Sequence, residues 1–328
     1  MTAVQTETVR AEAEPSVVNR AAALLRQGEA IALPTETVYG LAADATREEA
    51  VLKIFQAKSR PRFDPLIVHV PDASWVEHLA QVEGAARATF DRLRNRFWPG
   101  PLTFVFPRRT VVPDIVTAGL DTVALRLSAH PVFSEIIRAF GGPLAAPSAN
   151  RFGRISPTAA AHVLDELDGL VPVIVDAGPT KHGLESTIIA LRNEQIEILR
   201  RGPVTEEQLA QFGRVSVVAD TLRPEAPGQL PSHYAPKTRL VLLNDAAAFV
   251  PPAGGRSGLL SWRTQDTQRF EEVRCLSERQ DLAEAAKNLF RYLRELDQRN
   301  LDLIVAEKVP DAGLGAAIND RLRRASRL

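Results

Sequence analysis

Helical and strand-like hydrophobic patterns alternate over the first two hundred residues, and this alternation restricts the possible folds more than any other feature. Val17, Ala21 and Leu24 repeat at the spacing of a helix, and a short apolar run at residues 31–33 follows them. Residues 123–127 instead alternate with a period of two, which is typical of a strand. Interleaved helices and strands predict an α/β fold, with a twisted open mixed sheet and flanking helices.

The same patterns, together with capping residues, predict further elements. We expect additional strands at residues 66–70, 102–106, 144–146, 173–176, 186–191, 196–200 and 215–218. We expect additional helices over residues 75–97 and 132–140. Helix starts are expected where a side chain can satisfy free backbone N–H groups, namely at Ser16 and at the pairs Thr46 with Glu49 and Thr205 with Gln208.

A proline-rich stretch at residues 223–236 divides the chain, because proline at this density suits neither a helix nor a central strand. We therefore predict four parts, which are a flexible N-terminus (1–15), a large domain (16–213), an extended linker (214–237) and a smaller α/β domain (238–328). In the smaller domain we expect strands at residues 240–243, 258–260 and 303–305 around a helix at 282–296.

The balance of charges and the cysteine content exclude several classes of protein. Lys and Arg together number 40, as do Asp and Glu, so no global positive field favours nucleic acid or an anionic membrane. Any anion must therefore be bound by a local cluster of cations. The single cysteine, Cys275, excludes an internal disulfide and a thiolate zinc site, and we expect it to be a buried thiol.

The chain has no recognisable membrane or export signal. No apolar run approaches the roughly 20 residues that a membrane helix needs. The first 15 residues are polar and acidic, and they lack the basic and hydrophobic regions of a secretory signal. We expect a cytoplasmic protein that makes no contact with a membrane.

Two segments collect the polar groups that nucleotide chemistry needs. Hydroxyls, closely spaced cations, a histidine and a Ser/Asn turn are groups that can hold a triphosphate and an amino acid, and here they lie on loops or strand ends. The first segment contains PTETVYG (34–40), Lys58, Arg60 and PLIVH (65–69), and the second contains PSAN (147–150) and GRISP (153–157). This combination predicts an enzyme.

Individual residues allow both a functional and a structural interpretation. Lys58 and Arg60 would point to the same side of an extended segment and could bind one polyphosphate, although two cations also suit a solvated helix end. Arg126 projects from the second face of its strand and offers a bidentate group for a carboxylate, or it is a surface arginine. His69 lies in an apolar strand, where a buried core histidine is the more common outcome. Asn150 alone could form an Asx turn.

The ordered motifs resemble the L-threonylcarbamoyladenylate synthase family in its long form, and the resemblance covers nearly the whole chain. Besides the segments above, it rests on FWPGPLTFV (97–105), TAGLDTVALR (117–126), GLEST (183–187), ILRRGP (198–203), HYAP (233–236) and DAGLGAAINDRL (311–322). The resemblance implies a YrdC-type domain followed by a Rossmann-like C-terminal domain. It also implies a nucleotidyltransferase that converts ATP, bicarbonate and L-threonine into threonylcarbamoyladenylate and pyrophosphate.

The resemblance further implies roles for individual residues and partners. Lys58 and Arg60 are expected at the catalytic centre. The expected L-threonine contacts are Thr37, His69, Arg126 and Ser186. The expected nucleotide contacts are Arg60, Asp64, Thr122, Ser148, Asn150, Ser156, Arg200 and Tyr234. Mg²⁺ is expected with ATP, held mainly by phosphate oxygens, since the sequence has no P-loop and no histidine pair at metal-ligand spacing. The product is expected to pass to a tRNA threonylcarbamoyltransferase complex that modifies position 37 of tRNA.

Some positions depart from the family pattern. Asp64 stands where many members carry asparagine, so its carboxylate is expected beside Mg²⁺ or the nucleotide, and Pro231 stands where some relatives carry an aromatic residue. Tyr234 in the linker is expected to cover the nucleotide and exclude water, although a proline-rich spacer between two domains is the alternative.

Two other functions remain open from the sequence. One is a carbamoyl or acyl transferase of the same fold, which usually carries additional modules that are missing here. The other is a double-stranded RNA-binding module, for which the arginines at 321, 323, 324 and 327 would be suitable.

Overall fold

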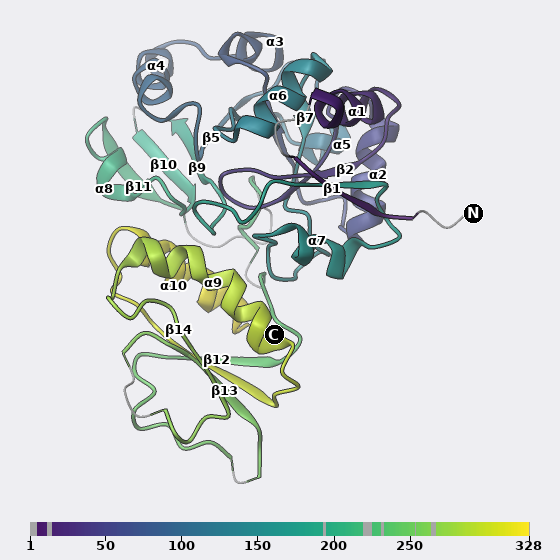
Figure 1. Cartoon of the computed structure of the whole chain (residues 1–328). Coiled ribbons are helices and arrows are strands. Elements are labelled where there is room, and N and C mark those ends of the chain that lie inside the picture. Colours follow the sequence, from purple (N-terminus) through teal and green to yellow (C-terminus); the bar gives the residue numbers. More distant parts are fainter. Residues whose placement is uncertain are drawn as a thin grey trace.

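The computed structural model describes residues 5–11, 15–192, 195–218, 225–230, 233–252, 254–263 and 267–327. Within these residues, the larger domain is built on an 11-stranded mixed sheet of order β1-β8-β2-β3-β7-β4-β6-β5-β9-β10-β11 (Figure 1). Its strands are β1 (Glu7–Arg10), β2 (Ile31–Leu33), β3 (Gly40–Asp44), β4 (Ile67–His69), β5 (Leu102–Pro107), β6 (Thr122–Arg126), β7 (Leu144–Ala145), β8 (Val173–Asp176), β9 (Thr187–Arg192), β10 (Gln195–Arg200) and β11 (Arg214–Val217). The predicted twisted α/β sheet is confirmed.

Helices pack on this sheet because most of its inner strands are apolar on both faces. They are α1 (Pro15–Arg26), α2 (Glu48–Lys58), α3 (Val76–Leu79), α4 (Ala85–Phe97), α5 (Asp114–Thr117), α6 (Pro131–Phe140), α7 (Ala160–Leu167) and α8 (Glu206–Leu209), with a 3₁₀ turn at Ala73–Trp75. Successive residues of β2 enter different cores. Ile31 and Leu33 pack with α1 and α6, whereas Ala32 joins the large core that contains Phe90 of α4.

The site is built on the face of the sheet that strands β4, β6 and β9 form. Here Ile67, Ala124 and Ile188 form a small apolar cluster, and Ala226 of the linker packs on them. Strands β4 and β6 run parallel, and their register places His69 beside Arg126. Both side chains therefore project from the same face as Ile67.

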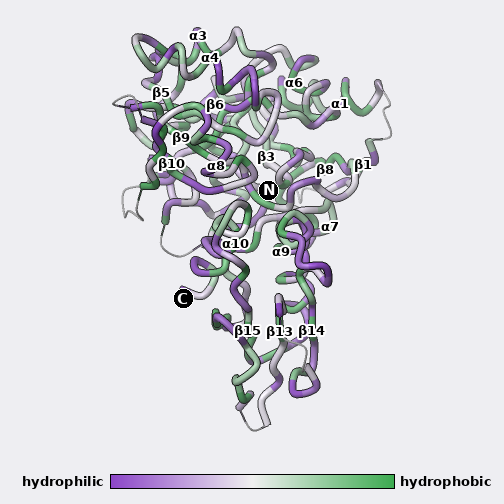
Figure 2. Tube along the Cα trace, turned by 90° about the vertical axis from the view of Figure 1, so that its left-hand side faces the viewer, coloured by the Kyte–Doolittle hydropathy of each residue, from purple (hydrophilic) through white to green (hydrophobic). Residues whose placement is uncertain are grey.

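The smaller domain contains a parallel four-stranded sheet of order β12-β15-β13-β14. Its elements are β12 (Arg239–Leu243), β13 (Ser257–Ser261), β14 (Glu272–Cys275), α9 (Leu282–Asp297), β15 (Leu303–Glu307) and α10 (Leu314–Ala325). The two helices lie side by side between this sheet and the larger domain (Figures 1 and 2). This arrangement agrees with the expected Rossmann-like domain.

Several local predictions need correction. Residues 7–10 were expected to be flexible, but they form β1, which pairs in parallel with β8. The strand expected at residues 215–218 is confirmed as β11, but it was assigned to the linker, whereas it pairs with β10 in the sheet of the larger domain. The expected helix over residues 75–97 is divided into α3 and α4. Pro231 and the rest of segments 219–224 and 231–232 of the linker lie outside the described residues.

The capping predictions succeed only in part. Thr205 and Gln208 form the predicted capping box of α8. Thr46 instead bonds to Asp44, and the N-cap of α2 is Arg47. Ser16 lies inside α1, which begins at Pro15. The single cysteine, Cys275, was expected to be buried, but it is only half-buried. In the described part of the chain, no helix is long and apolar enough to cross a membrane.

Candidate active site

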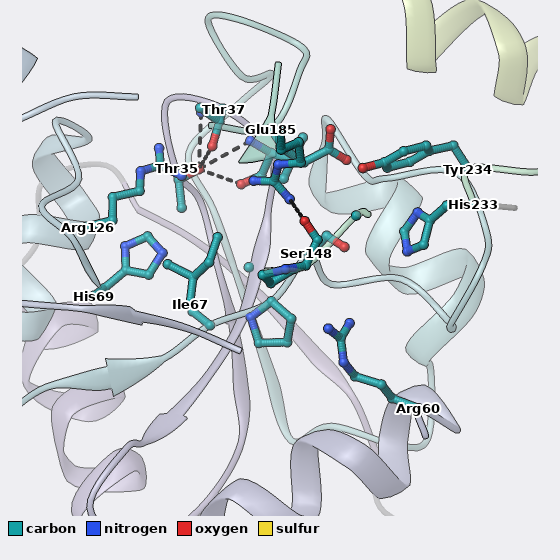
Figure 3. A pocket seen from close by; sticks show the side chains of 17 residues that line it. Thr35, Thr37, Arg60, Ile67, His69, Arg126, Ser148, Glu185, His233 and Tyr234 are labelled. Atoms are coloured by element: carbon teal, nitrogen blue, oxygen red, sulfur yellow. Dashed lines mark hydrogen bonds between the residues drawn. The ribbon is translucent and has the colours of Figure 1, made fainter. Parts of the chain in front are cut away.

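A pocket lies where the strand ends of the larger domain meet the linker (Figure 3). Its wall contains seven of the residues that the sequence predicted for the site, which are Thr37, Arg60, His69, Arg126, Ser148, Arg200 and Tyr234. They come from the turn after β2, the segment after α2, strands β4, β6 and β10, the turn after β7, and the linker. Segments far apart in the sequence thus converge on one cavity.

The end of the pocket beside β6 is organised by a buried ion pair. The Nη2 of Arg126 donates to Glu36 Oε1 at 2.7 Å, and its Nε donates to the Gly100 carbonyl at 3.3 Å. The Ser128 hydroxyl donates to the second Glu36 oxygen at 2.5 Å. Burial alone would raise the pKa of Glu36, but the Arg126 charge and the Ser128 hydroxyl hold that pKa at about 2. Glu36 therefore fixes Arg126 in orientation and leaves its Nη1 for a ligand.

His69 lies next to this pair and is a neutral ring. Burial, reinforced by the charge of Arg126, lowers the pKa of His69 to about 3. The ring stands 4.8 Å from that of Phe133, and its Nδ1 has no hydrogen-bond partner among the described residues. Nearby, the hydroxyls of Thr35 and Thr37 lie 2.8 Å apart (Figure 3). This end of the pocket offers a cation, a neutral imidazole and hydroxyls.

The two cations expected to point the same way do not do so. Lys58 is the last residue of α2, and Ser59 has a left-handed backbone conformation, so the segment is not extended. Lys58 is buried, donates to the backbone carbonyls of Ser148 and Asn150, and is not part of the pocket wall. Burial, with the neighbouring Arg60 charge, places the pKa of Lys58 well below its usual value.

Arg60 does line the pocket, and its charge is paired with Asp64. Its Nη2 lies 2.8 Å from Asp64 Oδ2 and donates to the Pro65 carbonyl at 2.9 Å. Burial raises the pKa of Asp64, and Oδ1 of this carboxylate has no hydrogen-bond partner within the described part of the chain. Asp64 thus acts on the pocket through Arg60.

The other predicted contacts lie at varying distances from the cavity. Arg200 lines it and donates to the Ser186 carbonyl and hydroxyl at 3.1 Å, whereas Arg201 has its side chain elsewhere, near Glu206. Ser186 and Ser156 are buried behind the wall, where Ser156 donates to Glu185. The remaining two, Asn150 and Thr122, are outside the wall as well, the latter at the start of β6.

The linker closes the pocket with His233 and Tyr234 (Figure 3). The Tyr234 ring stacks on Phe290 of α9 at 5.6 Å, and the Arg321 guanidinium lies 5.0 Å from its centroid. The Tyr234 hydroxyl is buried without a hydrogen-bond partner among the described residues. Gly228 beside it has a φ of +84°, which favours glycine, and a Cβ there would lie 2.7 Å from that hydroxyl and 2.9 Å from Arg200 Cδ. The cavity that remains is only about 40 Å³.

Sequence reasoning missed the buried carboxylates of the site. Glu36 stands within PTETVYG, and Glu185 stands within GLEST and lines the pocket. Both are charged residues inside motifs that were already singled out, which is a signal that could have found them. Their partners Arg126 and Arg321 are 90 and 136 residues away, respectively, so spacing in the sequence could not pair them.

Comparisons with known proteins agree with this geometry. A family model described as "Telomere recombination" matches residues 23–202, and one described as "Threonylcarbamoyl-AMP synthase, C-terminal domain" matches residues 204–327. A threonylcarbamoyl-AMP synthase of Bacillus subtilis is 40% identical, with 94% of this chain and 92% of the relative covered. The chain belongs to the threonylcarbamoyl-AMP synthase family. It has the long two-domain form of that family.

Archaeal relatives agree with the assignment. A threonylcarbamoyl-AMP synthase of Pyrococcus abyssi is 38% identical, covering 97% of this chain and 96% of the relative. The crystal structure of P. abyssi Sua5 complexed with L-threonine superposes with a TM-score of 0.88 at 37% identity. That comparison covers 98% of this chain and 97% of the other, so both domains are shared.

Proposed function

We propose that this chain condenses L-threonine, bicarbonate and ATP into threonylcarbamoyladenylate and pyrophosphate. The observation that carries the proposal is the convergence of Arg126, His69 and Thr37 with Arg60 and Arg200 on one pocket. Arg126, His69 and Thr37 offer groups that can bind an amino acid. The guanidinium groups of Arg60 and Arg200 can bind a polyphosphate. The relatives named threonylcarbamoyl-AMP synthase, and the P. abyssi protein complexed with L-threonine, support the same reaction.

The reaction needs positioning and charge stabilisation rather than an enzyme nucleophile. The amine of threonine adds to the carbon of bicarbonate, a C–O bond breaks and water leaves, which gives a carbamate. A carbamate oxygen then attacks the α-phosphorus of ATP. Pyrophosphate leaves as the new P–O bond forms. Arg126 Nη1 binds the threonine carboxylate, while Arg60 and Arg200 stabilise charge on the phosphates. His69 is neutral, and it can accept or donate one hydrogen bond to threonine.

Lys58 acts in this proposal by shaping the nucleotide site. It holds the carbonyls of Ser148 and Asn150, and Ser148 lines the pocket. Direct contact between Lys58 and a phosphate would require it to leave these carbonyls. A Lys58→Met variant with a raised KM for ATP and an unchanged KM for L-threonine would support a role on the nucleotide side.

The linker must move for ATP to enter. A cavity of about 40 Å³ holds only about three water molecules, whereas ligand pockets typically reach several hundred Å³. Tyr234 and His233 of the linker line the pocket and leave little space in it for a nucleotide. With Tyr234→Ala, we expect lower activity and faster hydrolysis of the mixed anhydride, because water would reach it. Unchanged turnover and an unchanged lifetime of the intermediate would contradict a lid role.

Mg²⁺ is proposed to accompany ATP and to neutralise charge on its phosphates. Among the described residues, no cluster of three or more potential ligands is found. The residues present fit an ion held chiefly by the nucleotide. Asp64 is buried outside the pocket wall beside Arg60, so its Oδ1, an oxygen of the type that Mg²⁺ prefers, would reach the ion only if the Arg60 pair opens. Asp64→Asn should therefore raise the Mg²⁺ concentration needed for half-maximal activity.

We further propose that the product serves a tRNA threonylcarbamoyltransferase complex in the cytoplasm, as the first step of modification at position 37 of tRNA. A mixed carbamic–phosphoric anhydride is an activated acyl donor, so a transferase must consume it. A carbamoyl or acyl transferase of the same fold is the alternative. It would use carbamoyl phosphate instead of threonine and bicarbonate.

Pyrophosphate release by the purified chain tests the main proposal. With ATP, Mg²⁺ and bicarbonate, we expect release that depends on L-threonine, together with a product of the mass of threonylcarbamoyladenylate. Arg126→Lys should reduce the release through a raised KM for threonine, because the single ammonium of lysine cannot keep the pair with Glu36 and contact the threonine carboxylate in the same fixed geometry. Release without threonine dependence would refute the proposal and favour the alternative transferase.

A further inference from the structure

Thr35 and Thr37 both line the catalytic pocket, and their hydroxyls are joined in one chain of hydrogen bonds (Figure 3). Both side chains are buried. The proposed reaction uses Thr37 and gives Thr35 no role. The direction of the hydrogen bonds between them decides what Thr37 can bind.

The Thr35 hydroxyl is occupied by contacts within the chain. It lies 2.6 Å from the Val38 carbonyl oxygen, and since a carbonyl has no proton, the hydroxyl is the donor of this bond. The same hydroxyl oxygen accepts from the backbone N–H groups of Thr37 and Val38, at 3.1 and 3.2 Å. Thr35 therefore lines the pocket without a free hydroxyl proton for a ligand.

This arrangement fixes the direction of the bond between the two hydroxyls. Their oxygens lie 2.8 Å apart, and the only hydroxyl proton of Thr35 points to Val38, so Thr37 is the donor to Thr35. Val38 is buried, and within the described part of the chain no other donor to its carbonyl is found. Reversing the chain would leave that oxygen unpaired, which is costly. Thr37 Oγ1 thus presents only lone pairs to the pocket.

We propose that Thr35 is a positioning residue that holds Thr37 as a hydrogen-bond acceptor for the amine of the amino-acid substrate. The inference rests on the proposed function. An acceptor without a free proton repels carboxylate and phosphate oxygens, whereas it suits an N–H of threonine or of its carbamate. Arg126 lies in the same pocket wall and takes the carboxylate, which leaves the amine for Thr37. An N–H held on Thr37 orients the nitrogen lone pair for the bicarbonate carbon.

Titration of the full-length chain with L-threonine, without ATP, tests the proposal and requires no turnover. Thr37→Val keeps the shape but removes the acceptor, so the Kd should rise about tenfold, the effect of one hydrogen bond. Thr35→Val should raise the Kd by about threefold or more, and Thr35→Ser, which keeps the hydroxyl, should retain the parent value. In the Thr37→Val background, Thr35→Val should change the Kd by less than about twofold, because the group through which Thr35 acts is gone.

A ligand without the amine locates the contact. (R)-3-hydroxybutanoate has the carboxylate, hydroxyl and methyl groups of threonine, so Thr37→Val should weaken its binding by less than about twofold. An equal loss for both ligands would place the threonine hydroxyl on Thr37 and overturn the proposal. A full effect of Thr35→Val in the Thr37→Val background would also overturn it, since Thr35 would then only support the turn. The ligand comparison uses Thr37→Val alone, so it remains decisive if a thermal unfolding curve shows that Thr35→Val is unfolded.

Thr46→Val is the matched control. The Thr46 hydroxyl also stabilises a turn, by donating to Asp44 Oδ1 at 2.7 Å, but Thr46 is not part of the pocket wall, so the parent Kd should be retained. If the parent chain binds no L-threonine at millimolar concentration, the proposed function fails and this inference fails with it. If the parent chain binds L-threonine and Thr37→Val binds it equally well, the inference alone fails.

Discussion

At the scale of single residues, Glu36 determines how Arg126 is presented. The Glu36 carboxylate accepts one hydrogen bond from Arg126 and another from Ser128. Glu36→Gln keeps the shape but removes the charge, so the guanidinium loses its fixed orientation. We expect the KM for L-threonine to rise by roughly tenfold, about 1.4 kcal/mol, with a much smaller change in the KM for ATP. Threonine-dependent pyrophosphate release measures both constants.

A matched control for this substitution is Glu49→Gln. Glu49 pairs with Arg47 on the surface, where it is 67% exposed. An exposed pair contributes little, so this variant should retain the kinetics of the parent chain. An unchanged KM for threonine in Glu36→Gln would show that Arg126 does not depend on this carboxylate for its orientation.

Buried neutral His69 makes the stability of the fold depend on pH. Its pKa is about 3 in the folded chain, below the ordinary value of 6.5, so the unfolded chain binds a proton first as pH falls. Its contribution is constant above pH 6.5, and stability decreases from there towards pH 3 by up to about 1.4 kcal/mol per unit. Burial lowers the pKa values of the buried His233 and of the half-buried His130, His162 and His182 as well, which adds to the effect.

We therefore expect the free energy of unfolding to change less steeply between pH 6.5 and 5 in His69→Gln than in the parent chain. Urea titrations at several pH values measure this slope, which is independent of the overall loss of stability from the substitution. The same substitution at the exposed His78 is the control, and it should keep the parent slope. Equal slopes in all three proteins would contradict the assignment to His69.

The sequence anticipated residue types at the site better than their contacts. Arg126 was recognisable because it is the charged residue on one face of an otherwise apolar or small strand, and that reasoning is local. Lys58 was misjudged because the left-handed Ser59 breaks the expected extended segment, and nothing in the residue types reveals this. Glu36 was missed since its partners lie 90 and 92 residues away.

At the scale of elements, apolar patterns predicted most of the strands, but the edge strand β1 and the fully buried strand β3 were missed. The runs that form β2 and β8 are apolar because other elements pack on both faces of the sheet there. In contrast, β1 is polar and mostly exposed, and it is a strand only because β8, more than 160 residues later, supplies its hydrogen bonds. The strand β11 was expected at residues 215–218 but was assigned to the linker, since its residues are exposed or half-buried at the other edge of the sheet.

The contact between Gly183 and α9 is a point where two elements from different domains meet. Gly183 has a φ of +71°, and a Cβ there would lie 2.5 Å from the Ala286 carbonyl oxygen. Gly183→Ala combines the cost of a left-handed alanine, about 1 kcal/mol, with about 1–3 kcal/mol for the steric clash. Denaturant unfolding should show a loss of about 2–4 kcal/mol.

A matched control separates the two costs. Gly119 has a similar φ of +77°, but nothing lies within 4 Å of the Cβ position. Gly119→Ala should therefore lose only about 1 kcal/mol, the backbone cost alone. Equal losses in the two variants would mean that α9 moves away easily and that the domains are not closely packed here.

At the scale of the whole molecule, buried ion pairs join two domains whose charges balance overall. Arg294 of α9 pairs with Glu166 of α7 and donates to the Ile155 carbonyl, and Arg321 of α10 pairs with Glu185 at 2.9 Å. These arginines are nearly or fully buried. The equal numbers of acidic and basic residues in the sequence do not reveal that oppositely charged side chains gather at the interface between the two domains.

Arg321 connects this interface to the catalytic pocket, which leads to the final prediction. Its side chain is fully buried, pairs with Glu185 in the pocket wall, and lies over the ring of Tyr234. Arg321→Ala leaves Glu185 buried without its partner, and breaking such a pair typically costs about 3–5 kcal/mol. The linker should then lose its support, so amide hydrogen exchange at residues 225–230 and 233–236 should accelerate while exchange in β5 and β6 remains slow. Arg299→Ala, which removes an exposed arginine 3.6 Å from Glu272, is the control and should leave the linker protected. Unchanged exchange of the linker in Arg321→Ala would show that the larger domain alone holds Tyr234 over the pocket.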